Sequence, residues 1–491
     1  MAGPGECAAD VRVGRAAVSG GSALAVRQGL VHGANLLGAI ALARLAGPSV
    51  FGVYAVGVFV VSVLRTLSSS GVAANIIRSR GEPVPGELDG LFLAQLGLAL
   101  AAAAPLVLFA SPIARAYGMP WPGAWLFRAA GAALVLSAFQ VIPQVLLERD
   151  VRFWAVAGVE VPQAIAFNAV AVAGPLLGKP VAGLAAALVV RAAVGVALAQ
   201  RARPWRPRLS RLSLGPAVGH LDFGLFFLGS GVLSLLKDAI VPVFLAVLLG
   251  VRAAGLVTWA LLMATYPLTL IMGLQRLYLP LFAELGRAPE RLRSGIRAAV
   301  AASNLVVAPA AALTLAVVPS ATRGLFGAQW LPALPLFYLF WVGNLLSPTT
   351  GPLMGAANSA GFARLTFAFS AGWFAATWGL GAPLIVAFGA VGFAVANLLS
   401  QGINFVFFGA VGRRLGRGLW RPAFRPWLCA AVLYLSARLA IALWAPAGLV
   451  GFWLAACGGL LSYAAALWIF YPGQVSRAVA AARGAAVRCW R

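Results

Sequence analysis

Residues 41–60 have the sequence ALARLAGPSVFGVYAVGVFV, in which Gly47 and Pro48 separate two long apolar runs. Each run is long enough to cross a bilayer as a helix. A Gly-Pro pair is typical of a turn, so the stretch predicts a transmembrane helical hairpin. Arg65 falls at mid-depth of the second run, where a charged side chain is costly unless it faces protein or water.

The start of this hairpin recurs 203 positions later in the chain. Residues 244–257, FLAVLLGVRAAGLV, align without a gap with residues 41–54. The identical pairs are Leu42 with Leu245, Ala43 with Ala246, Leu45 with Leu248, Gly47 with Gly250 and Gly52 with Gly255. Because transporters built from internal repeats show weak internal symmetry, the alignment predicts two repeated lobes.

The composition fits a membrane protein. Of the 491 residues, 62% are hydrophobic and only 10% are charged, and the mean hydropathy is +0.92. Soluble domains carry about 25% charged residues. The sequence therefore predicts a polytopic all-α membrane protein.

The apolar runs predict about fourteen transmembrane helices, as two six-helix lobes plus two C-terminal helices. Among the predicted helices are 123–147, 153–177, 180–200, 363–388 and 390–411. The predicted parts are a disordered cytoplasmic tail (1–21), an N-terminal lobe (22–200), a basic cytoplasmic linker (201–218), a C-terminal lobe (219–411), a basic cytoplasmic loop (412–426), two extra helices (427–470) and a cytoplasmic tail (471–491). No loop on the other side is long enough to be a domain.

The net charge of +25 would suggest nucleic acid in a soluble protein. Here the basic residues gather in the loops on one side of the predicted helices, and the opposite side carries only Arg115, Lys179, Arg252 and Arg323. This asymmetry follows the positive-inside rule and predicts a multi-pass membrane protein with both termini in the cytoplasm. The charge therefore requires no nucleic-acid partner.

Several ionisable side chains lie within the predicted helices. Arg65, Lys237, Arg276, Arg27 and Arg191 are the candidate substrate-binding residues, and Asp238, Glu160 and Asp222 are candidates for ion coupling or for charge pairing. A cleft with more cations than carboxylates favours an anionic cargo, because guanidinium groups match phosphate oxygens. Cations near helix ends also have a simpler explanation, which is that they reach toward the membrane surface.

Polar side chains share faces of the first, second, seventh and eighth predicted helices, as expected for a water-filled cleft between repeats. These stripes are Gln28, His32 and Asn35; Ser62, Arg65, Ser68 and Ser69; Ser230, Ser234, Lys237 and Asp238; and Thr258, Thr265, Thr269 and Arg276. The alternative is that single Ser and Thr hydroxyls bond their own helix backbone. In the twelfth helix Asn397, Ser400, Gln401 and Asn404 lie on one face, for contact with a sugar or with a neighbouring helix.

The opening hairpin resembles that of polysaccharide-transport flippases, the Wzx-like branch of the multidrug/oligosaccharidyl-lipid/polysaccharide exporter superfamily. Arg44, Gly47, Pro48, Phe51, Gly52 and Tyr54 carry this resemblance, and 141–160 and 351–367 are similar to later family segments. Arg65 with Gly71 is also similar to the second helix of lipid II flippases, although their more heavily charged first helix is missing here. The resemblance implies alternating-access flipping of a polyprenyl-diphosphate-linked oligosaccharide across the bacterial inner (cytoplasmic) membrane, with Arg65 at the diphosphate.

The expected function is therefore a flippase, with membrane lipids and other polysaccharide-assembly membrane proteins as further partners. An ion-coupled drug or metabolite exporter of the same fold is the alternative, and a membrane-embedded glycosyltransferase is the third hypothesis. The predicted outer loops lack the paired carboxylates or histidine that such an enzyme needs, so no enzymatic activity is expected. No cofactor or metal is expected either, because the sequence has no Walker-type phosphate loop and its four cysteines have no metal-site spacing.

Overall fold

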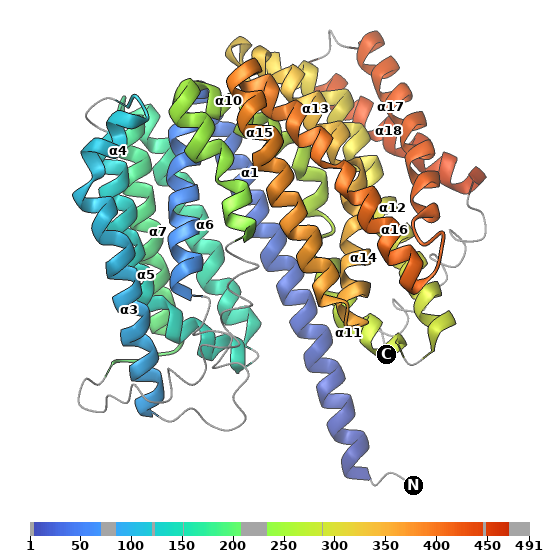
Figure 1. Cartoon of the computed structure of the whole chain (residues 1–491), viewed down its shortest axis with the longest axis horizontal. Coiled ribbons are helices and arrows are strands. Elements are labelled where there is room, and N and C mark those ends of the chain that lie inside the picture. Colours follow the sequence, from blue (N-terminus) through green and yellow to red (C-terminus); the bar gives the residue numbers. More distant parts are fainter. Residues whose placement is uncertain are drawn as a thin grey trace. The chain divides into compact units, whose positions relative to one another are not determined.

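The chain folds as a bundle of long apolar helices. The computed structural model describes residues 4–69, 85–119, 123–150, 152–207, 233–286, 288–444 and 448–470, and all regular elements in these ranges are helical (Figure 1). Ten helical stretches in this part of the chain are long and apolar enough to cross a membrane. The protein is thus a polytopic membrane protein, and the exact count of fourteen helices stays a prediction.

The first compact unit comprises residues 1–259 and 373–393. Its helices are α1 (Pro4–Ser69), α3 (Pro85–Leu108), α4 (Ala110–Ala116), α5 (Gly123–Arg149), α6 (Phe153–Leu176), α7 (Pro180–Ala202), the π-helical segment η2 (Ile240–Leu245) and the first part of α10 (Ala246–Thr269). Helix α6 packs against α1 and α7, and α5 packs against α3 and α7. The observed bounds of α5, α6 and α7 lie within two residues of the apolar runs in the sequence.

The second compact unit comprises residues 260–372 and 394–491. Its helices are α11 (Met272–Leu285), α12 (Pro289–Ala321), η3 (Thr322–Phe326), η4 (Ala328–Ala333), α13 (Leu334–Gly343), η5 (Asn344–Leu346), α14 (Ser347–Ser359), α16 (Gly402–Leu415), η6 (Arg421–Ala423), α17 (Phe424–Trp444) and α18 (Gly448–Phe470); α15 (Ala363–Ser400) contributes to both units. The C-terminal pair α17 and α18 packs on α12, where Cys429, Leu433 and Ala437 are completely buried.

Glycines break three of the long apolar stretches. Gly47 has φ 74° and ψ 179° within α1, and its repeat partner Gly250 has φ 83° and ψ 163° within α10. Gly389 has φ 62° within α15, at the boundary that the apolar runs predict. L-residues with a side chain rarely adopt a positive φ, so glycine is needed at these breaks. The two glycines of the sequence repeat therefore make the same turn.

The two repeated turns contact each other within the first unit. A Cβ atom on Gly52 would overlap the carbonyl oxygen of Val251, and a Cβ on Gly255 would overlap the carbonyl oxygen of Pro48. Both pairs of positions are related by the 203-residue offset of the sequence alignment. The contact is therefore reciprocal: each repeat places the same glycine against the same backbone carbonyl of the other.

Two features of the structure differ from the sequence-based expectations. The prediction of disorder for residues 1–21 is wrong for residues 4–21, which form the start of α1; alanine, the strongest helix former, recurs there and favours a helix. The compact units also divide at residue 259 instead of at the linker 201–218. The reciprocal glycine contact explains this difference, because it joins the start of α10 to α1.

Candidate functional site

A chain of buried amide side chains crosses the interior of the first unit. Gln163 of α6 donates from Nε2 to Oε1 of Gln140 on α5 at 2.9 Å, and Gln140 donates to Oε1 of Gln144 at 2.7 Å. Gln144 in turn donates to Oε1 of Glu160 at 3.0 Å. Unpaired amides are costly in an apolar medium, so linking them in one chain makes their burial tolerable.

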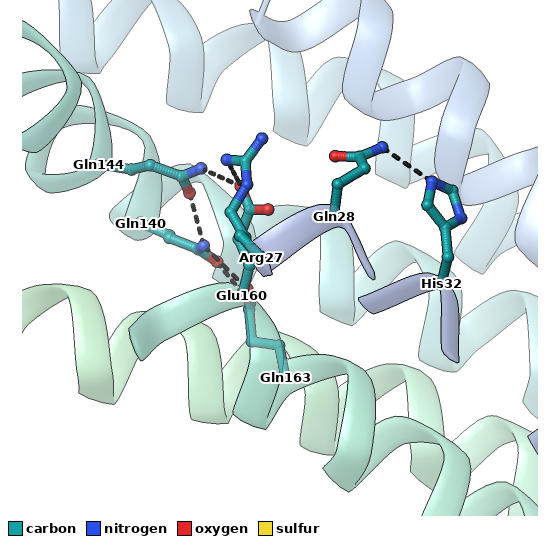
Figure 2. Close-up of polar contacts among 7 residues, drawn as sticks. All are labelled: Arg27, Gln28, His32, Gln140, Gln144, Glu160 and Gln163. Atoms are coloured by element: carbon teal, nitrogen blue, oxygen red, sulfur yellow. Dashed lines mark hydrogen bonds and ion pairs between the residues drawn. The ribbon is translucent and has the colours of Figure 1, made fainter. Parts of the chain in front are cut away.

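An ion pair stands at the end of this chain. Nη1 of Arg27 on α1 lies 3.3 Å from Oε1 of Glu160 on α6, and Figure 2 shows Arg27 and Gln144 pointing at the same carboxylate. The Arg27 side chain is only 8% exposed and the Glu160 side chain 27%. The buried Nε of Arg27 has no hydrogen-bond partner among the described residues. Arg27 thus has a buried, unmatched donor beside a carboxylate that accepts two hydrogen bonds.

Arg191 of α7 lies at the other end of the amide chain. Its backbone carbonyl accepts a hydrogen bond from Nε2 of Gln163 at 3.2 Å, and its guanidinium carbon lies 5.6 Å from the ring centre of Phe167. That ring lies 6.0 Å from the ring of Tyr54, in the opening hairpin. The structure therefore brings three of the predicted site residues, Arg27, Glu160 and Arg191, into one connected polar cluster.

A close helix approach positions the amides. Gly195 of α7 faces them, and a Cβ at this position would overlap the Gln163 amide nitrogen and the Gln140 amide oxygen. The absence of a side chain on Gly195 thus makes room for the hydrogen bond between α5 and α6. A shorter side chain at either glutamine would remove this hydrogen bond.

We expect Gly195→Ala to destabilise the first unit by about 1–3 kcal/mol, because the added methyl group must displace hydrogen-bonded amides. Thermal unfolding of the purified protein in detergent measures the effect. Gly158→Ala on α6 is the matched control, since nothing lies within 4 Å of its Cβ position. Equal melting temperatures for the two variants would contradict the steric role of Gly195.

Lys237 and Asp238 form a separate ion pair in the helical residues 233–238. The Lys237 side chain is 31% exposed and that of Asp238 57%, so the pair is less buried than Arg27 and Glu160. The neighbouring carbonyl of Leu236 accepts a hydrogen bond from Trp378 Nε1 of α15 at 2.7 Å, which anchors this segment.

Three predicted site residues are not placed at the side-chain level. Arg65 lies in α1 and Arg276 in α11, and their side chains are outside the described residues. Asp222 lies entirely outside them. Their assignment as substrate-binding or charge-pairing residues stays a prediction.

Several polar side chains of the predicted stripes have local partners. The hydroxyls of Ser62, Thr265 and Thr269 donate to carbonyls of their own helices at 2.8, 2.7 and 2.7 Å, which is the alternative explanation for such hydroxyls. Asn404 accepts a hydrogen bond from Thr350 of α14 at 2.7 Å and contacts Gln401. In this structure the Asn404 face therefore contacts a neighbouring helix.

The sequence analysis missed Gln140 and Gln144. They lie four residues apart, one helical turn, in an otherwise apolar segment, and this spacing was the available signal. Two neighbouring glutamines on one face of a membrane helix are costly without partners, so they indicate an internal polar contact. Gln28 and His32 of α1 were predicted to share a face, and they contact each other at 2.8 Å (Figure 2).

Comparison with known proteins gives sequence matches to polysaccharide and lipopolysaccharide biosynthesis proteins. The family model described as "Polysaccharide biosynthesis protein" matches residues 41–335. The succinoglycan biosynthesis transport protein ExoT of Rhizobium meliloti (strain 1021) is 26% identical over 313 residues, which span 62% of each chain. The lipopolysaccharide biosynthesis protein WzxC of Escherichia coli (strain K12) is 24% identical over 364 residues, or 72% of each chain.

Solved structures share the fold at low sequence identity. The lipid II flippase MurJ in an inward closed conformation matches with a TM-score of 0.72 and 11% identity, over 93% of this chain and 100% of that one. An inward-facing multidrug transporter of the MATE family matches with a TM-score of 0.53 and 17% identity, over 79% and 94%. The helix arrangement is thus that of these multi-pass transporters.

Proposed function

Since this chain belongs to the polysaccharide biosynthesis protein family, we propose that it moves a polyprenyl-diphosphate-linked oligosaccharide across the bacterial inner membrane by alternating access. The names of its relatives, a succinoglycan transport protein and a lipopolysaccharide biosynthesis protein, support an oligosaccharide cargo. The fold that it shares with a lipid II flippase supports a lipid-linked one. The assigned activity is transport, and no residue is assigned a catalytic role.

The observation that carries the proposal is the nearly buried Arg27 guanidinium with an unmatched Nε. Within a membrane the dielectric constant is low, so such a donor attracts an anion far more strongly than it does at a surface exposed to water. Arg27, Arg191 and Lys237 are the described cations of the proposed diphosphate path, and Arg65 and Arg276 are its other members. Guanidinium groups suit this task because their planar donors match phosphate oxygens.

Glu160 provides a way to release the cargo diphosphate from Arg27. While the carboxylate is ionised it neutralises Arg27, and a protonated or otherwise engaged Glu160 leaves the guanidinium available to the diphosphate. Binding of cargo and pairing with Glu160 then compete for one cation, so a proton or a cation on Glu160 favours cargo binding. Asp238 beside Lys237 provides a second pair of the same kind, and Asp222 remains a proposed third carboxylate.

The proposal is tested by measuring the rate at which a fluorescent polyprenyl-diphosphate oligosaccharide is translocated in proteoliposomes. The variants Arg27→Gln and Lys237→Gln are expected to flip at least about tenfold more slowly, the loss that follows from removing one charge-assisted contact of about 1.5–3 kcal/mol. Arg323→Gln is the matched control, because Arg323 is an exposed arginine of η3 outside the cluster.

Normal flipping by both site variants would refute the assignment of these cations. The same proteoliposomes, loaded with a cationic dye, test the drug or metabolite exporter as the alternative. Dye transport that depends on an ion gradient, without transport of the lipid-linked sugar, would favour the exporter.

A further inference from the structure

An apolar groove lies on the first unit between α3, α5 and α7, and no side chain of the amide cluster lines it. Its volume is about 750 Å³. Small residues of α3 and α5 form part of its lining, among them Ala103, Ala104 and Gly131, and larger apolar residues such as Leu100 and Phe139 complete it. A Cβ atom on Gly131 would overlap a methyl group of Val107, so α3 and α5 approach closely beside the groove.

The groove runs along α5 from Arg128 to Phe139. The end of α3 and the start of α5 lie together at one end, near Leu108 and Arg128, and Leu100 and Phe139 lie together at the other. From Arg128 to Phe139 the helix rises about 16 Å, at 1.5 Å per residue. This is roughly half of a hydrocarbon core that is about 30 Å thick, so the length of the groove matches the depth of one leaflet.

Arg128 is the one cationic residue among those that line the groove. Its guanidinium carbon lies 5.2 Å from the ring centre of Trp125, which is 54% exposed one helical turn nearer the helix start. None of the ion pairs among the described residues involves Arg128. An exposed tryptophan beside an arginine is typical of the level of the lipid head groups.

We propose that this groove binds an anionic glycerophospholipid of the leaflet that the charge asymmetry places outside. One acyl chain lies along the small residues of α3 and α5, and the phosphate accepts hydrogen bonds from Arg128. The single-leaflet length fits an acyl chain, whereas the much longer polyprenyl tail of the proposed cargo would extend far beyond it. The site is therefore distinct from the proposed transport path.

The test is a titration of the purified full-length protein with phosphatidylglycerol, and in parallel with phosphatidylcholine, followed by native mass spectrometry. Arg128→Gln is expected to weaken phosphatidylglycerol binding about fivefold, the contribution of one basic residue at a membrane surface, and to abolish the preference over phosphatidylcholine. Ala104→Phe fills the groove from an exposed position and is expected to weaken the binding of both lipids.

Two matched controls accompany these variants. Arg115→Gln removes an exposed arginine of the neighbouring helix α4, and Ala101→Phe adds a ring at an exposed position of α3 outside the groove. Both are expected to bind phosphatidylglycerol like the wild type. The titration does not depend on transport, so its outcome is independent of whether the flippase proposal holds.

The proposal is overturned if Arg128→Gln or Ala104→Phe binds phosphatidylglycerol as well as the wild type does while its melting temperature is unchanged. It is also overturned if the wild type binds both phospholipids equally. A polyprenyl phosphate that displaces phosphatidylglycerol at lower concentration would assign the groove to the cargo instead.

Discussion

Glu160→Ala is expected to destabilise the protein by about 3–5 kcal/mol, because it leaves the Arg27 guanidinium buried without its carboxylate. The Arg27 side chain is only 8% exposed, so water cannot readily replace the lost partner. Gln144 loses its acceptor on Glu160 in the same variant, which disturbs the amide chain as well. Titration with sodium dodecyl sulfate in mixed micelles, followed by circular dichroism, measures the free energy of unfolding.

The double variant Arg27→Met, Glu160→Leu separates stability from function. Replacing both members of a buried ion pair by apolar side chains of similar size is often neutral or stabilising, so this variant is expected to unfold close to the wild type. It is also expected to lose transport, because it lacks the proposed diphosphate donor. If Glu160→Ala unfolds like the wild type, the ion pair does not hold Arg27 in place and the competition mechanism fails with it.

Gly52→Val is expected to destabilise the protein by about 3 kcal/mol, the upper end of the overpacking range. The added side chain would overlap the carbonyl oxygen of Val251, and a backbone carbonyl cannot rotate away as a flexible side chain can. Gly255→Val is expected to have an effect of the same size, because it makes the reciprocal overlap with the carbonyl of Pro48. The same titration in mixed micelles measures both.

Gly97→Ala in α3 is the control for these two variants, since nothing lies within 4 Å of its Cβ position. Removing an interior helical glycine there is expected to be neutral or to stabilise by up to about 1 kcal/mol. A large effect at Gly52 with none at Gly255 would contradict the reciprocal contact.

The sequence was sufficient for the membrane class, for the bounds of α5, α6 and α7 and for the breaks at Gly47 and Gly389. These features depend on local properties, namely apolar length and the conformational freedom of glycine. The 203-residue offset also predicted that Gly47 and Gly250 would make the same turn. It could not show that the two turns contact each other, because a contact between distant segments leaves no local pattern.

The site was predicted only in part for the same reason. Arg27 and Glu160 stood out as charges in apolar segments, but their pairing joins α1 to α6 across 133 positions of sequence. Gln140 and Gln144 were not predicted, because a neutral amide costs less in a membrane than a charge does and therefore indicates a buried partner less strongly. The role of Gly195 depends on what faces it, which only the packed helices reveal.

The reciprocal contact of Gly52 and Gly255 bears on the origin of the chain. An interface in which each partner offers the same patch to the other is isologous, the arrangement of a two-fold homodimer. A protein that consists of one half would form this interface with a second copy of itself. Duplication and fusion of its gene would then make the contact intramolecular. Fusion then frees most positions of the two halves to diverge. It does not free these glycines, because a side chain on either one meets a main-chain atom that every residue type retains.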